Sequence, residues 1–170
     1  MLGTVESIHI AKKIDGNLSS LSEAKLVPGK GIVGDRWYRE KTDKEGNPVS
    51  WGAPKMELTF VEAEQIEQFN AKMGLRVEAH DVRRNIVTRG VSLNDLVGVE
   101  FMVGEVGVRG IELCEPCKHL GNRLASDPSN SPVSAPEIIE GLTHRAGLRA
   151  NIATGGTIRI GDPIIITPKR

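Results

Sequence analysis

The sequence has no long hydrophobic run and no excess of one charge. Its 170 residues include 22 Lys and Arg against 22 Asp and Glu, so the formal net charge is zero. A neutral protein is not expected to hold nucleic acid or a membrane surface mainly by electrostatic attraction. No segment reaches the roughly 18 apolar residues that span a bilayer, and residues 1–16 do not resemble a signal peptide. We therefore expect a cytoplasmic protein with neither nucleic-acid nor membrane partners.

Aromatic residues and cysteines are also scarce. Aromatics make up 4% of the chain and there are only two cysteines, whereas Gly occurs 19 times and Pro 9 times. This composition favours many short elements joined by tight turns, with a core of Val, Ile and Leu. The length predicts a single domain over residues 1–170. In a reducing cytoplasm a lone cysteine pair is rarely a structural disulfide.

Short apolar segments with alternating neighbours predict a mainly β fold with a few short helices. Ile66, Phe69 and Met73 have helical spacing before Gly74, and Ser134 with Glu137 predicts a second short helix as far as Glu140. One helical turn is expected at 92–95. Residues 15–54 read as a polar region without strands. Glycine turns between the short segments favour a closed or partly open β-barrel, with strands at 3–11, 56–60, 85–88, 99–103, 105–113, 148–154, 157–160 and 163–167.

Both cysteines lie in one segment, LCEPCKHL at 113–120, and several interpretations compete. A zinc site or a protein-held iron–sulfur cluster needs about four ligands, and there is no second pair. A thioredoxin-like dithiol needs a following helix, which residues 122–136 do not predict. Two inert buried thiols remain an alternative. Against that, Lys118, His119 and Arg123 follow closely, and positive neighbours favour a thiolate that can act as a nucleophile, a sulfur carrier or a metal ligand.

Three further segments carry groups suited to an anion. RRN at 83–85 and HRAGLRAN at 144–151 each place arginines, followed by an Asn, at the start of a predicted strand. GKGIVGDRW at 29–37 is a glycine-rich loop whose N–H groups can approach an anion, although it matches neither a Walker nor a Rossmann motif. Solvated charges and a plain turn are the alternatives for each segment alone. Together they favour an anion site near the cysteines.

The ordered set of these motifs resembles the MOSC family, named for the C-terminal domain of molybdenum-cofactor sulfurases. The resemblance extends from about Gly29 to Pro168 and is strongest to small stand-alone bacterial members. It rests on GKGIVGDR, ELTFVEAEQIEQ, RRNIVTRGVSLNDLVG, FMVGEV, LCEPCKHL and GTIRIGDPI. The resemblance implies a barrel of the MOSC, or pyruvate-kinase-barrel-like, type that binds molybdopterin, the pterin-based molybdenum cofactor.

The resemblance also implies roles for particular residues. Cys117 would be the molybdenum ligand or the sulfur carrier, and His119 and Asp35 would join it as catalytic residues. Trp37 stands where the family often has a histidine. The predicted cofactor-binding residues are Lys30, Gly34, Arg36, Arg84, Asn85, Lys118, Arg145 and Arg149.

Two functions stay open on the sequence. One is a molybdenum-cofactor-dependent reductase of N-hydroxylated bases or similar small molecules, with electrons from a separate donor protein. The other is a sulfur-carrier or cofactor-binding module, with a persulfide on Cys117 loaded by a cysteine desulfurase. Pyridoxal phosphate is associated with the sulfurases of the family, where a different domain holds it, and nothing in this sequence resembles that domain.

Overall fold

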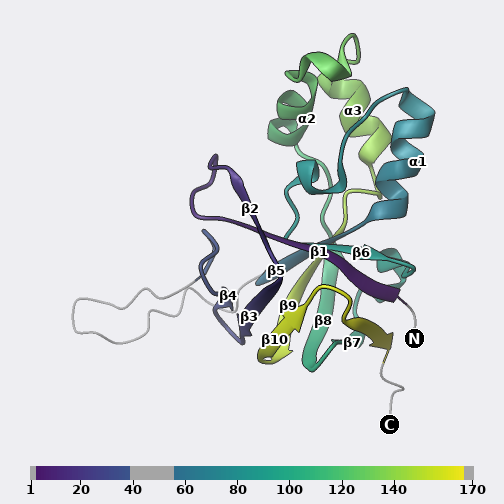
Figure 1. The fold of residues 1–170 in the computed structure, drawn as a ribbon. Coiled ribbons are helices and arrows are strands. Elements are labelled where there is room, and N and C mark those ends of the chain that lie inside the picture. Colours follow the sequence, from purple (N-terminus) through teal and green to yellow (C-terminus); the bar gives the residue numbers. More distant parts are fainter. Residues whose placement is uncertain (1–2, 39–55, 167–170) are drawn as a thin grey trace.

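A closed β-barrel forms the centre of the molecule (Figure 1). The computed structural model describes residues 3–38 and 56–166. Within them, seven strands close in the order β11-β7-β8-β9-β5-β6-β1, because β1 pairs with β11, and β2 adds to the outside of β1. The strands are β1 (Gly3–Ala11), β2 (Leu18–Leu21), β5 (Leu58–Glu62), β6 (Ile86–Arg89), β7 (Glu100–Val103), β8 (Val106–Leu113), β9 (Leu148–Thr154) and β11 (Pro163–Ile166). The predicted barrel is confirmed.

One pair of barrel strands, β5 and β6, is parallel, whereas every other pair is antiparallel. Parallel neighbours need a crossover connection rather than a hairpin. Helix α1 (Ala63–Met73) and the short 3-10 turn η1 (Ala79–Val82) supply it. The predicted helix is confirmed from Ile66 to its end at Gly74, which adopts the left-handed conformation with φ 71°.

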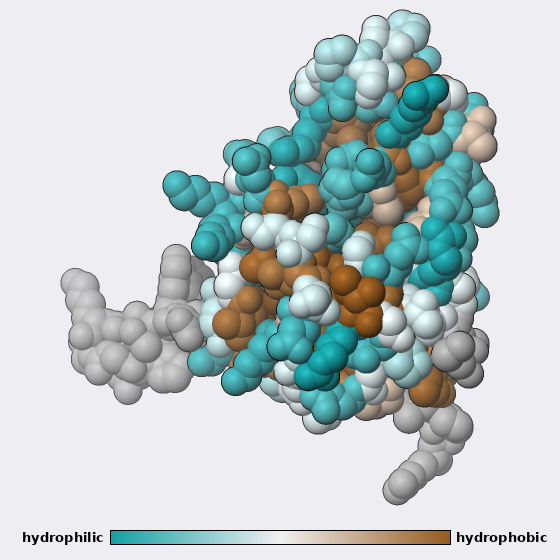
Figure 2. Space-filling model, in the orientation of Figure 1, coloured by the Kyte–Doolittle hydropathy of each residue, from teal (hydrophilic) through white to brown (hydrophobic). Residues whose placement is uncertain are grey.

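Two hydrophobic cores share the strands β5 and β6. Phe60 and Ile86 belong to the core inside the barrel, while Val61 and Val87 belong to a second core outside it. Burial on both faces explains why these strands read as continuous apolar runs. The second core also contains Ile138 of α3 (Ala135–Leu142). In Figure 1 the three helices gather at one end of the barrel, and in Figure 2 their outer faces are mainly hydrophilic.

The polar segment at 15–54, where no strand was predicted, contains three short strands among its described residues. It contains β2, β3 (Glu23–Val27) and β4 (Gly31–Ile32), and β10 (Gly156–Arg159) joins β3 and β4 in a small second sheet. Residues 39–55 of this segment lie outside the described residues. Strand β2 is exposed or half-buried throughout, so its sequence shows no apolar alternation. Within the described part of the chain, none of the helices has the length and apolar character needed to cross a bilayer.

The chain passes very close to itself at Gly147, just before β9. Gly147 has φ 113°, and a Cβ added there would lie 1.9 Å from the carbonyl oxygen of Phe60. Its own carbonyl accepts a hydrogen bond from the Cys114 N–H at 2.7 Å. The absence of a side chain at this position therefore lets the start of β9 lie against β5 while it also forms a hydrogen bond with the cysteine segment at 113–120.

We expect Gly147→Ala to lower the free energy of unfolding by about 3 kcal/mol or more, because the new Cβ displaces the backbone of β5. Gly74→Ala is the matched control, since Gly74 also has a positive φ but open space around it. That variant should lose only about 1 kcal/mol of left-handed strain. Urea unfolding of both variants measures the difference, and equal losses would contradict the close approach.

Candidate functional site

The two cysteines lie between the end of β8 and the start of helix α2 (Lys118–Ala125). Cys114 is buried and Cys117 is exposed. Cys117 directly precedes α2 as its N-cap residue, next to the free N–H groups of the first turn. The sequence did not predict a helix after the pair. That expectation was wrong, because Leu120 and Leu124 join the second core while Gly121 packs closely against α3.

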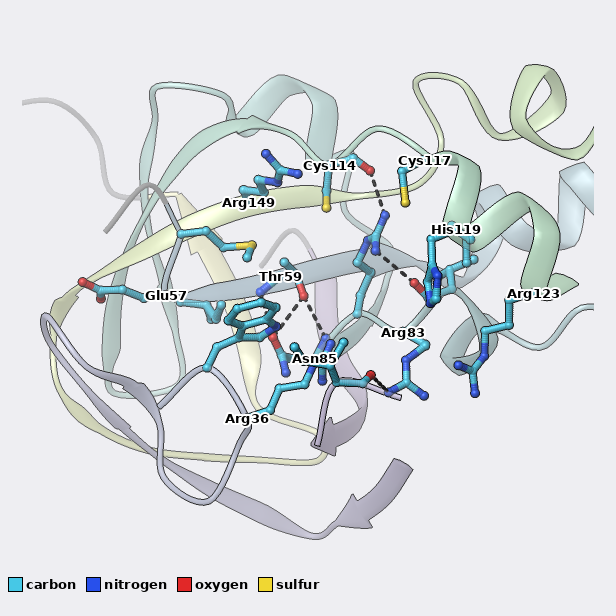
Figure 3. Close-up of a pocket in the computed structure, with 17 residues that line it drawn as sticks. Arg36, Glu57, Thr59, Arg83, Asn85, Cys114, Cys117, His119, Arg123 and Arg149 are labelled. Atoms are coloured by element: carbon cyan, nitrogen blue, oxygen red, sulfur yellow. Dashed lines mark hydrogen bonds between the residues drawn. The ribbon is translucent and has the colours of Figure 1, made fainter. Parts of the chain in front are cut away.

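A cavity of about 240 Å³ opens beside both cysteines (Figure 3). Five arginines contribute to its wall from four parts of the chain: Arg36, Arg83, Arg84, Arg123 and Arg149. Glu57 is the one acidic residue among the described residues that line it, and its carboxylate accepts hydrogen bonds from the N–H groups of Gly29 and Ile152. The cavity therefore combines thiols with an excess of positive charge.

Arg84 holds the cysteine segment in place. Its Nη2 donates to the carbonyl of Cys114 at 3.0 Å, its Nε to Ala146 at 2.7 Å and its Nη1 to Val82 at 3.0 Å. Burial lowers the pKa of this guanidinium, and repulsion from Arg149 contributes in the same direction. None of the side chain's hydrogen bonds among the described residues goes to a carboxylate. Arg84 therefore orders three backbone segments while its charge remains available to the cavity.

Arg36 and Arg149, which both line the cavity, each have one donor atom without a partner in the described part of the chain. The Nε atoms of both are buried and have no hydrogen-bond partner among the described residues. Arg149 also donates through Nη1 to Glu112 at 2.7 Å, and this hydrogen bond is the main reason that its pKa is raised. A buried donor without a partner is costly, so these two atoms point to an acceptor that a ligand would bring.

Arg83 and Arg123 line the cavity although neither was among the predicted site residues. Arg83 has a left-handed backbone with φ 60°, and its Nη2 donates to the carbonyls of Ile14 and Gly16 at 2.9 and 3.0 Å. Burial lowers the pKa of Arg83, and repulsion from Arg123 and Arg36 lowers it further. The RRN motif contained the signal for Arg83. Arg123 was visible only as a positive neighbour of the cysteines.

Asn85 lines the cavity, but most of the hydrogen bonds of its side-chain amide join neighbouring strands. Its Oδ1 accepts from the Thr59 N–H and hydroxyl at 3.2 and 3.0 Å, and its Nδ2 donates to the His9 carbonyl at 3.2 Å. Asn85 is buried and connects three neighbouring strands of the barrel. Thr59 also lines the cavity. It belongs to the ELTFVEAEQIEQ motif, but nothing singled it out within that motif, because a threonine is an ordinary strand residue.

The structure places several predicted residues away from the cavity. Asp35 is buried and accepts from the N–H groups of Ala11 and Trp37, so its carboxylate orders the loop rather than facing the cysteines. Arg145 donates to Gln65 and Gln68 of α1. Lys30, Gly34 and Lys118 also do not line the cavity, although they lie in segments adjoining it. Membership of a sequence motif therefore did not determine whether a residue lines the cavity.

His119 does line the cavity, from the first turn of α2. Its side chain is 68% exposed, and Nε2 lies 3.2 Å from Asp15 Oδ1. An exposed imidazole next to a carboxylate can exchange protons with solvent. Of the three predicted catalytic residues, the structure thus brings Cys117 and His119 together and leaves Asp35 in the loop.

Comparison with known families identifies the class. The model of the MOSC domain matches residues 47–165, so this chain belongs to the MOSC domain family. A search of curated proteins finds no significant match.

Solved structures share the fold at low identity. The YuaD protein from Bacillus subtilis has a TM-score of 0.80 and 20% identity, covering 96% of this chain and 94% of that one. YiiM from Escherichia coli has a TM-score of 0.66 and 16% identity, over 98% and 70%. YiiM from Geobacillus stearothermophilus gives 0.63 and 16%, over 98% and 75%. At these identities the likeness extends to the fold alone.

We expect Arg84→Lys to loosen the cysteine segment, because an ammonium cannot reproduce the planar fork that joins three carbonyls. Each buried carbonyl left without a donor costs about 1–3 kcal/mol. Urea unfolding should show a loss of stability, and alkylation of Cys114 by iodoacetamide should become faster in the folded protein. Arg123→Gln, on the same cavity wall but without these hydrogen bonds, is the control. Unchanged Cys114 alkylation in Arg84→Lys would contradict the role.

Proposed function

We propose that this protein binds the molybdenum cofactor in the cysteine cavity and reduces N-hydroxylated bases or related small molecules. The observation that carries the proposal is an exposed thiol, Cys117, opening onto a cavity lined by five arginines. Membership of the MOSC domain family supports it, since this family is associated with that cofactor. A pterin cofactor combines a phosphate with a soft metal, and the cavity offers guanidinium groups together with a thiol.

The donors of the cavity fit such a group. A thiolate at Cys117 would be the protein ligand to molybdenum, because soft metals prefer sulfur. The unpartnered Nε atoms of Arg36 and Arg149 would donate to acceptors of the cofactor. Among the described residues, no three His, Cys, Asp or Glu side chains cluster closely enough to hold a metal ion. A metal centre that arrives with its own dithiolene sulfurs needs only one ligand from the protein.

The chain's own residues would bind, shield and supply protons. When bound, the cofactor supplies the two-electron chemistry that removes an oxygen atom from the substrate. Ile14 and Trp37 line the cavity and are exposed, so they provide apolar surface for a flat base at its entrance. His119, whose Nε2 lies close to Asp15, would relay protons from solvent to the oxygen that leaves as water. A separate donor protein would deliver the electrons.

The exposure of Cys117 favours sulfur transfer as a second candidate function. A thiol at the surface can be reached by the persulfide of a cysteine desulfurase. Its sulfur would attack the outer sulfur of that persulfide, so that the extra sulfur moves to Cys117 and the desulfurase regains a thiol. The protein would then carry sulfur without turnover of its own.

We expect protein purified from a host that makes the cofactor to contain molybdenum and pterin, and Cys117→Ser to lose most of the molybdenum. Serine keeps the size of the side chain but is not a soft ligand. Cys114→Ser should retain the metal. Arg145→Gln should retain it as well, because the Arg145 guanidinium donates to Gln65 and Gln68 of α1 and does not line the cavity. Elemental analysis and pterin fluorescence measure both components. Equal metal content in wild type and Cys117→Ser would contradict the proposed ligand.

Activity separates the two candidate functions. Loaded wild-type protein with a chemical reductant should convert 6-hydroxylaminopurine to adenine, and Cys117→Ser should not. Mass spectrometry after incubation with a cysteine desulfurase and cysteine tests the alternative. If a persulfide forms on Cys117 and the loaded protein does not reduce the substrate, the sulfur-carrier function would be supported and the reductase function contradicted.

A further inference from the structure

A second cavity, of about 390 Å³, lies next to the cysteine cavity and shares Arg83 and Arg123 with it. Its remaining wall comes mainly from the start of β2, the segment between α1 and η1, η1 itself and the segment after α2. It includes Arg76, His80, Asp81, Asp127 and Asn130. Arg83 and Arg123 lie on the same side of the cysteine cavity in Figure 3. We propose that this second cavity binds a small organic phosphate that also carries a hydroxyl or amino donor.

The arginines of this cavity form no ion pair with a carboxylate in the described part of the chain, although Asp15 and Asp35 attract Arg83 from a longer distance. Among the described residues, the guanidinium groups of Arg76 and Arg123 make no hydrogen bond or ion pair. Arg83 uses its Nη2 on two carbonyls, while its Nη1 and Nε make no hydrogen bond there. Arg83 and Arg123 are close enough to repel each other. An anion bound between them would relieve that repulsion and accept hydrogen bonds from both, as phosphates do with arginine.

The acidic residues of the cavity are already engaged elsewhere. Asp81 Oδ2 accepts from the Glu78 N–H at 2.8 Å, and its Oδ1 lies 3.5 Å from His80 Nε2. Asp127 Oδ1 accepts from both the N–H and the hydroxyl of Ser129 at 2.9 and 2.7 Å. These carboxylates cap their own turns and form no ion pair with the arginines, but they keep their negative charge, so three arginines face two aspartates in the described lining. The described lining therefore carries one net positive charge, and its guanidinium donors are left for a ligand.

Asn130 adds an independent sign of a ligand. It is only 3% exposed, and its Nδ2 donates to the Leu124 carbonyl at 2.9 Å. Its Oδ1 is buried and has no partner among the described residues, although the side chain lines the cavity. A buried acceptor of this kind is rare unless something donates to it. An anion alone cannot donate, which is why the ligand class includes a hydroxyl or amino group.

Ribose 5-phosphate is a suitable probe, because it carries both a phosphate and hydroxyl donors. Isothermal titration calorimetry of cofactor-free protein at fixed ionic strength should show saturable binding. Arg76→Gln should weaken it at least about tenfold, through loss of a charge-assisted hydrogen bond. Arg76 lines only the second cavity and Arg149 only the first, so Arg149→Gln should leave the affinity within about twofold of wild type.

Arg109→Gln is the control for net charge, because Arg109 lies in β8 and lines neither cavity. Weakening by Arg149→Gln but not by Arg76→Gln would overturn the inference, since the phosphate would then occupy the cysteine cavity. Equal weakening by Arg109→Gln, or no saturable binding at millimolar ribose 5-phosphate, would overturn it as well.

The phosphate can come from two sources, the cofactor itself or a separate phosphorylated molecule. Loaded protein distinguishes them: unchanged binding of ribose 5-phosphate indicates a separate ligand, and lost binding indicates the phosphate of the cofactor. The inference does not depend on the proposed function, because the Arg76→Gln comparison uses cofactor-free protein and measures no reaction.

Discussion

The hydrogen bonds from Arg84 to three carbonyl oxygens are the interaction on which the candidate site depends. They join the turn before β6, the cysteine segment and the segment before β9. Because these partners are carbonyl dipoles and not a carboxylate, the arginine orders the wall without being neutralised by it. The same guanidinium thereby fixes Cys114 and adds positive charge beside Cys117. A single side chain thus helps to fix the cavity wall and also adds to the positive charge that the other four arginines supply.

The barrel makes this arrangement possible through the parallel pair β5 and β6. Their crossover brings α1 onto the outside of the barrel, and the second core that forms there also contains residues of α2 and α3. Helix α2 therefore begins where the cysteine segment leaves the barrel, which places Cys117 at its N-terminus. The close approach at Gly147 completes the contact between the segments. The crossover between β5 and β6 and the close contact at Gly147 thus determine both the fold and the position of the site.

The sequence predicted the barrel and one cluster of chemical groups, and failed where tertiary packing decides. Alternating apolar residues predicted most barrel strands, and the motifs brought Cys117, His119 and three of the arginines to one cavity. Helix α2 was missed because residues 122–136 show no helical pattern, whereas the helix begins before them, at Lys118. Gly121 within it is a poor helix former, but it allows close contact with Ile139. Arg145 and Arg149 are four residues apart in one motif, yet only Arg149 faces the cavity. Spacing along the chain cannot tell which side of a strand or loop a side chain will occupy.

X-ray absorption at the molybdenum edge tests the central claim most directly, because it reports the atoms around the metal in the loaded protein. The account predicts one sulfur ligand in addition to the cofactor's own pair in wild-type protein, and its replacement by a lighter atom or its loss in Cys117→Ser. Identical spectra for the two proteins, both loaded with cofactor, would show that the thiol at position 117 does not reach the metal and would contradict the account.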